Sequence, residues 1–127
     1  MAVDLNNALA NALLDRYDTE FPAGSILEIR TGAVQGAENA DAGTVLFSFT
    51  LPATPWSAAA SGAKTKNGTW SGSATGTGIA AHYRMRNAGD TRREEGTVGQ
   101  GSGDLSLDNT NIVSGQTVTI NSFTKTL

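Results

Sequence analysis

Hydrophobic residues recur about every four positions at the start of the chain and every second position over most of the rest. The first pattern predicts a short amphipathic helix from about Asp4, which can cap it, to Tyr17. Its apolar stripe consists of Leu5, Leu9, Leu13 and Tyr17. A helix this short is stable only when docked, so we expect the stripe to contact either the chain's own sheet or a neighbouring molecule.

After Gly24 the alternation predicts a series of short strands. The clearest runs cover residues 25–31, 44–51, 79–86, 91–98 and 116–127. In the third run, the expected inward residues are Ile79, Ala81, Tyr83 and Met85, and the expected outward residues are Ala80, His82, Arg84 and Arg86. Asn67-Gly68 predicts a two-residue hairpin turn, and residues 32–43 read as a surface loop.

Strands spaced this closely, with glycine turns between them, are typical of an antiparallel sandwich or barrel. We therefore expect a mainly β fold, an antiparallel β-sandwich or jelly-roll-like domain with a short N-terminal helix. The 127 residues suit one domain, with the helix and its connector in residues 1–24 and the sandwich in residues 25–127.

Composition and charge narrow the choice of partners. Only 17% of residues are charged and the net charge is −3, so the basic footprint of a nucleic-acid-binding protein is missing. The chain has no cysteine, which excludes disulfides and thiolate chemistry. Its apolar runs are too short to cross a bilayer, and its first residues do not read as a signal peptide. We expect no nucleic-acid, membrane or cofactor partner.

The search for catalytic residues yields little. His82 is the only histidine, and it is expected on an outward face beside arginines, which disfavours a metal or acid–base role. Glu94 and Glu95 resemble a carboxylate pair, but neighbours on a strand point to opposite faces. We expect them to pair across the hairpin with Arg84 or Arg86. The sequence therefore predicts a protein that is not an enzyme.

The densest group of charges lies on the hairpin of residues 79–98. It consists of Arg84, Arg86, Arg92, Arg93, Glu94 and Glu95. Such a group is either a solvated face or a docking surface for a partner. Together with the helix stripe, these residues are the predicted partner contacts.

Two further features have alternative interpretations. The glycine-rich loop 99–103 reads as a flexible turn, although Asp104 and Asp108 beside it are able to hold a weakly bound calcium ion. Trp56 and Trp70 are expected in the core, and the alternative is a platform on which sugar rings stack.

The order of segments also resembles a family of small structural proteins of tailed-bacteriophage virions. The resemblance is carried by the helix followed by residues 27–32 (LEIRTG), 43–52 (GTVLFSFTLP), 67–70 (NGTW), 76–84 (GTGIAAHYR), 96–99 (GTVG), 103–109 (GDLSLDN) and 112–120 (IVSGQTVTI). It spans nearly the whole chain. The sequence departs from the family pattern at residues 92–95 (RREE), where a milder strand is expected.

The resemblance implies a head decoration or cement protein, made in the host cytoplasm and placed on the capsid exterior. Its expected partner is the major capsid protein of the same phage, with self-association as a dimer or trimer on the lattice. Two alternatives stay open: a low-copy tail or neck component, and a carbohydrate-binding β-sandwich module.

Overall fold

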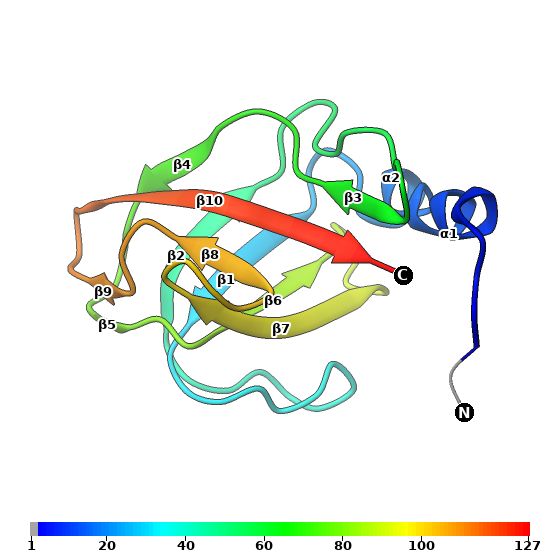
Figure 1. Cartoon of the computed structure of the whole chain (residues 1–127). Helices are drawn as coiled ribbons and strands as arrows, with labels where there is room; N and C mark the ends of the chain where they lie inside the picture. Colours follow the sequence, from blue (N-terminus) through cyan, green and yellow to red (C-terminus); the bar gives the residue numbers. More distant parts are fainter. Residues whose placement is uncertain (1–2) are drawn as a thin grey trace.

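The computed structural model describes residues 3–127, and it has the expected mainly β architecture with helix only near the N-terminus (Figure 1). The helices are α1 (Asn7–Leu14) and α2 (Tyr17–Glu20). The strands are β1 (Ile26–Arg30), β2 (Val45–Thr50), β3 (Ala63–Thr65), β4 (Trp70–Ser73), β5 (Gly78–Ile79), β6 (His82–Arg86), β7 (Arg93–Gly99), β8 (Leu105–Leu107), β9 (Asn111–Ile112) and β10 (Thr117–Thr126).

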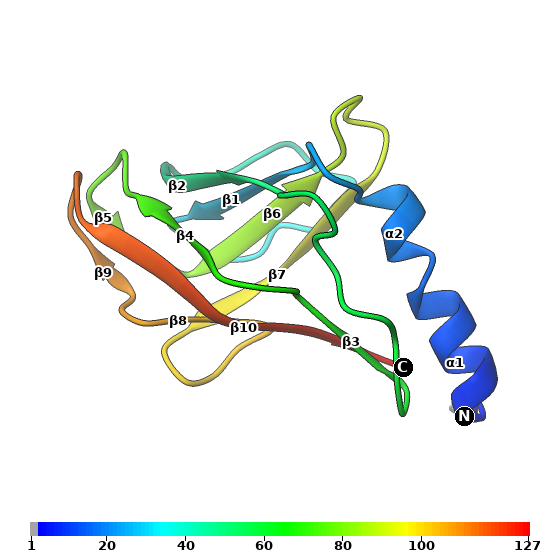
Figure 2. The ribbon, with the colours of Figure 1, turned by 90° about the horizontal axis from the view of Figure 1, so that it is seen from above.

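The main sheet runs in the order β2-β1-β6-β7-β8-β10-β3, and β4 also pairs with β10. It curls until the segment after β4 returns to β2, where the amides of Thr75 and Gly76 both donate to the Leu46 carbonyl. The two halves thus face each other across the core, as in a sandwich (Figure 2). The pairing is antiparallel except between β7 and β8, which run parallel.

The core contains the aromatic residues that the sequence predicts for it. Trp56 and Trp70 are buried, and their rings meet edge to face with centroids 5.4 Å apart. Trp70 also stacks on Phe49 and meets Phe123 edge to face. Each indole N–H donates to a backbone carbonyl, of Phe21 for Trp56 and of Asn67 for Trp70. The core prediction for both tryptophans is confirmed.

The N-terminal helix is shorter than predicted and docks by a different face. Asn6, not Asp4, caps it, since the Asn6 Oδ1 accepts the Leu9 N–H at 3.0 Å. The buried residues are Ala10 and Leu14. The predicted stripe lies beside them, so that Leu9 is 49% and Leu13 is 50% exposed.

Two strand predictions are wrong in detail. The run 79–86 forms two strands, because its pairing partner changes within the run. Its first part, β5, pairs with β9, and its second part, β6, pairs with β1. This change of partner shifts the alternation, so Ile79 is exposed and Ala80 is buried, while Tyr83 and Met85 point inward as predicted. The turn at Asn67-Gly68 does not form a hairpin either, since β3 and β4 both pair with β10 and not with each other.

The outward face of β1, β6 and β7 is not a solvated surface. His82 and Arg84 are both 1% exposed, because the loop of residues 32–43 folds back over them. The Nη atoms of Arg84 donate to the carbonyls of Gly36 and Asn39 and to the carboxylates of Asp41 and Glu95. The prediction that these two side chains are exposed is therefore wrong.

The same covering loop meets other charged side chains and is closed by a glycine. Arg86 contacts both Glu28 and Asp41, and Arg30 contacts the same two carboxylates. Gly43 ends the loop at φ +73°, where a Cβ would lie 1.9 Å from the Thr31 carbonyl oxygen. Only glycine fits there. Ionic contacts and one tight turn thus hold the loop against the sheet.

This buried network predicts acid sensitivity. Hydrogen bonds from Arg86 hold the pKa of Asp41 below its usual range. Burial alone raises the pKa of Glu95, but hydrogen bonds from Arg84 and from the Gln35 amide outweigh it, and the resulting pKa is also lowered. Carboxyls whose pKa is lower in the folded state stabilise the fold above their unfolded pKa of about 4, and that stability is lost as the pH falls through the folded value.

We therefore expect the free energy of unfolding, from urea titrations followed by tryptophan fluorescence, to fall once the pH drops below about 4. The variant Asp41→Asn should show a shallower fall, because one of the two carboxyls no longer titrates. Equal stability at pH 7 and pH 3 would contradict this account of the network.

Candidate docking groove

A groove is lined by residues of the helices and of the strands β7 and β10. The helices and the end of β10 lie at the end of the molecule where the C-terminus lies (Figures 1 and 2). The groove has two adjoining hollows, which share Leu13 and Tyr17. The first is about 350 Å³ and is lined by Leu13, Leu14, Tyr17, Tyr83, Glu94, Glu95, Asp104 and residues 124–127. The second is about 240 Å³ and is lined by Leu13, Arg16, Tyr17, Glu20, Phe21, Arg92 and Arg93. We call the second hollow the arginine slot.

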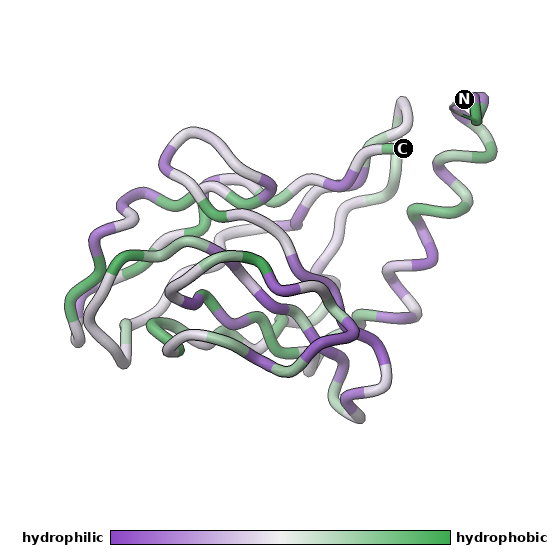
Figure 3. Tube along the Cα trace, turned by 90° about the horizontal axis from the view of Figure 1, so that it is seen from below, coloured by the Kyte–Doolittle hydropathy of each residue, from purple (hydrophilic) through white to green (hydrophobic). Residues whose placement is uncertain are grey.

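The helix is fastened to the body by polar contacts as well as by Ala10 and Leu14. The side chain of Lys64 in β3 is fully buried, and its Nζ lies 2.8 Å from the Asp15 carboxylate and 3.2 Å from that of Asp18. The Asn11 Oδ1 accepts the Gly62 N–H at 2.9 Å. These contacts fix the rotation of the helix, which leaves Leu9 and Leu13 on its outer side. Figure 3 shows the hydrophobic positions that recur along it.

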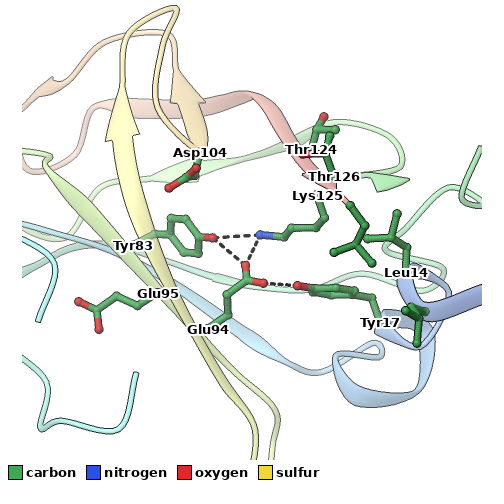
Figure 4. Close-up of a pocket in the computed structure, with 11 residues that line it drawn as sticks. Leu14, Tyr17, Tyr83, Glu94, Glu95, Asp104, Thr124, Lys125 and Thr126 are labelled. Carbon is green, nitrogen blue, oxygen red and sulfur yellow. Dashed lines mark hydrogen bonds and ion pairs between the residues drawn. The ribbon is translucent and has the colours of Figure 1, made fainter. Parts of the chain in front are cut away.

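The first hollow is built around the Glu94 carboxylate, as Figure 4 shows. The hydroxyls of Tyr17 and Tyr83 both donate to this carboxylate, and the Lys125 ammonium contacts it as well. Lys125 also donates to the Tyr83 hydroxyl at 2.9 Å and lies over the Phe123 ring, 3.6 Å from its centroid. One carboxylate thus ties together a helix, a central strand and the end of β10.

The electrostatics of this cluster favour a structural role. Burial raises the pKa of Tyr17 and of Tyr83, and the neighbouring Glu94 charge raises both further, so both phenols stay protonated as donors. Burial lowers the pKa of Lys125, and the contact with Glu94 opposes that change. Glu94 already accepts from three donors. Its main effect is to hold the first hollow in shape.

The arginine slot has an apolar floor and a charged rim. Leu13, Tyr17 and Phe21 form the floor, and the Tyr17 and Phe21 rings pack with centroids 5.7 Å apart. On the rim, the Glu20 carboxylate accepts from the Nε atoms of both Arg16 and Arg92, at 2.8 and 2.9 Å. The slot is therefore a small apolar hollow with a surplus of positive charge at its edge.

The third rim arginine pairs with a different carboxylate from the other two. Arg93 makes two hydrogen bonds to the Asp90 carboxylate, at 2.9 and 3.2 Å. Both partners are well exposed, so the pair contributes little to stability but does restrain the guanidinium beside the slot.

The structure brings together part of the predicted contact set. Leu13, Tyr17, Arg92, Arg93 and Glu94 line the groove, and Glu95 borders it while its carboxylate points away from the Glu94 cluster (Figure 4). Of the stripe residues N-terminal to them, Leu9 is exposed and Leu5 is partly buried.

The remaining predicted contacts lie elsewhere. Arg84 and Arg86 belong to the network under loop 32–43, on the other face of the sheet. Glu94 and Glu95 point to opposite faces, as predicted, and Glu95 pairs across the hairpin with Arg84 at 2.5 Å. The predicted partner contacts thus divide into a groove and a covered network.

Lys125 is an important residue that sequence reasoning missed. In β10 the side chains of Val118 and Ile120 point inward. The register with β8 then shifts between Ile120 and Ser122, just before Phe123. The irregularity moves the inward face from even to odd positions, which places Lys125 on the same side as Phe123. The spacing of three between Ile120 and Phe123 is the signal in the sequence that indicates it.

Neither aspartate near the glycine loop joins a cation-binding group. The Asp104 carboxylate accepts from the amide and hydroxyl of Thr97, and the Asp108 carboxylate accepts from the Thr119 amide. Within residues 3–127 no three histidine, aspartate or glutamate side chains are grouped so as to hold a metal ion. The structure therefore gives the calcium alternative no support.

Comparison of the chain with known protein families, with curated proteins and with solved structures finds no match. Among the described helices, none has the length and apolar character needed to span a membrane.

Proposed function

We propose that this chain is a non-enzymatic structural protein of a tailed-bacteriophage virion, which decorates the head by binding the major capsid protein lattice through the groove. Self-association as a dimer or trimer on the lattice is part of the proposal. The resemblance of the sequence segments supplies the virion context, and the groove supplies a surface suited to docking.

The observation that carries the proposal is that helix α1 is firmly attached to the body while two of its leucines stay exposed. Buried Ala10 and Leu14, together with Lys64, fix it to the body, yet Leu9 and Leu13 remain half exposed beside the groove. Keeping two leucines of a short, firmly attached helix in water contributes nothing to the isolated fold. Covering them with a partner does lower the free energy of the complex.

A cement protein acts by mass action, because it binds the assembled lattice and so stabilises it relative to its separated subunits. Such a protein works best as a rigid body with a preformed contact surface, since little ordering free energy is then lost on binding. The Glu94 cluster ties a helix and two strands together at the groove, and the ion network under loop 32–43 holds the other face of the same sheet.

The geometry counts against a carbohydrate-binding module, and it suits a tail or neck component as well as a decoration protein. A carbohydrate-binding module built on Trp56 and Trp70 needs accessible rings, and both are buried here. A tail or neck component would use the same kind of groove, and it differs from a decoration protein in its number of copies.

The test is binding to virus particles that lack the protein, prepared from a deletion mutant of the phage that encodes it. We expect the purified chain to bind and to raise the temperature at which the particles release DNA. The double variant Leu9→Ser/Leu13→Ser should bind at least about tenfold more weakly, a loss of roughly 1.4 kcal/mol or more.

Val113→Ser is the matched control, because Val113 is 58% exposed and follows β9 at the end of the molecule opposite the helix (Figure 1). It should bind like the wild type. Failure of the wild-type chain to bind, or equal binding of the double variant, would overturn the proposal.

A further inference from the structure

We propose that the arginine slot binds an acidic segment of the partner protein, with one bulky apolar side chain of that segment seated on Leu13, Tyr17 and Phe21. This inference rests on the proposed function, and it names the chemistry of the partner segment. It is carried by the charge of the rim, the size and lining of the hollow, and the firmness of its walls.

The charge at the rim of the slot is opposite in sign to the net charge of the chain. The chain as a whole has a net charge of −3, yet the slot is lined by three arginines and one glutamate, and with Asp90, which pairs with Arg93, the rim still carries one net positive charge. The side chains of Arg16 and Arg92 are 67% and 56% exposed. A local surplus of exposed positive charge attracts an acidic partner segment, and it repels the same patch on a second copy, which disfavours a symmetric contact of slot against slot.

The rim arginines keep donors free for a ligand. Arg16 and Arg92 contact Glu20 through their Nε atoms. In the part of the chain that the structure describes, the terminal nitrogens of Arg16 have no hydrogen-bond acceptor, and Arg92 uses one of its own on the Thr91 carbonyl. The terminal nitrogens of a guanidinium are the donors that bind a carboxylate in the two-pronged manner.

The hollow suits a side chain and not a free small molecule. Its volume is about 240 Å³, below the ~300–1,000 Å³ of ordinary small-molecule pockets. Its floor of one leucine and two aromatic rings is apolar. Tyrosine and arginine around a small apolar hollow are the residues that most often dominate the binding energy of protein interfaces.

The walls of the slot are preformed. Tyr17 is anchored by its hydroxyl to Glu94 and packs against Trp56, and Phe21 is buried. Asp90 restrains Arg93 on the opposite wall. An occupant therefore needs to order only itself, so a short linear segment suffices.

The probes are three short synthetic peptides with the same backbone length. The first has a leucine and a phenylalanine four positions apart among glutamates. The second replaces the glutamates with lysines, and the third keeps the glutamates but replaces both apolar residues with serine. Each is titrated into the full isotope-labelled chain, and nuclear magnetic resonance follows the Leu13 methyls and the arginine Nε–H groups.

We expect the first peptide to bind at least about tenfold more tightly than the other two, with its largest shifts at the slot, and to weaken as salt is raised. Leu13→Ser and Arg92→Glu should each weaken it about tenfold, and both residues are exposed enough for the fold to tolerate the change. Lys66→Glu is the control, because it makes the same charge change outside the slot, where Lys66 donates to the Gly68 carbonyl.

Three results would overturn the inference. If the lysine peptide binds as tightly as the glutamate peptide, the slot does not select for negative charge. If Lys66→Glu weakens peptide binding as much as Arg92→Glu does, the binding depends on the overall charge of the protein and not on the slot. If the Leu13 signals broaden as the protein concentration rises, with no peptide present, the slot is occupied by a second copy of this chain. Particle binding separates this inference from the proposed function: binding to particles without peptide binding would leave the decoration role standing and refute only the acidic segment.

Discussion

Replacing Arg84 with methionine is expected to destabilise the protein by about 3–5 kcal/mol, because it removes one partner of a buried ion pair and leaves the other charge without compensation. Arg84 is 1% exposed, and the Glu95 side chain, on the neighbouring strand, is 2% exposed. The change also removes the donors for the Gly36 and Asn39 carbonyls, which hold the covering loop down.

Urea unfolding followed by tryptophan fluorescence measures this effect, and Arg93→Met provides the control. Arg93 pairs with Asp90 at the surface, where such a pair contributes little to stability. The double variant Arg84→Met/Glu95→Met should recover part of the loss, since no lone charge then remains buried. A loss below about 1 kcal/mol for Arg84→Met would show that the network is not the closed structure described above.

Trp70→Ala is the second change with a large expected effect, a loss of about 3–5 kcal/mol from the cavity it creates. Trp70 is fully buried and contacts the rings of Phe49, Trp56 and Phe123. It connects β4 with both halves of the curled sheet, so its loss removes packing on several sides at once.

The remaining tryptophan, Trp56, reports unfolding in this variant, and circular dichroism provides an independent signal. Val113→Ala is the comparison, because an exposed side chain at the far end should change stability by less than about 0.5 kcal/mol. If Trp70→Ala unfolds at the same urea concentration as the wild type, the indole does not bridge the two halves of the core.

The elements that the sequence predicts well are those in which local pattern and tertiary environment agree. The run at Val45–Thr50 reads as a strand and is one, and the two tryptophans belong to the core of a chain that has few other large residues. The opposite faces of Glu94 and Glu95 follow from strand geometry alone.

The predictions that are wrong concern features that depend on distant segments. Alternation predicts that Arg84 points away from the core, and it does, but nothing near it in the sequence shows that residues 32–43 cover that face. The irregularity before Phe123 and the change of partner after Ile79 shift the side-chain alternation where the strand pairing changes.

The groove was only partly predictable for the same reason. The stripe of Leu9 and Leu13 is visible in the sequence, and so is the charged run at residues 92–95. Leu13, Arg92 and Arg93 meet at one slot because Ala10 and Leu14 dock on the body and Lys64 pairs with the helices, and these are tertiary contacts. The sequence predicts the contact residues and the fold brings several of them into one surface.

The most direct test of the proposed function is the number of copies of this protein in each virus particle. Quantitative mass spectrometry of purified virions from the phage that encodes the chain measures it, with the major capsid protein as the internal standard. The decoration role predicts a copy number close to that of the major capsid protein. A handful of copies would place the protein in the neck or tail, and its absence from the particles would contradict the virion proposal altogether.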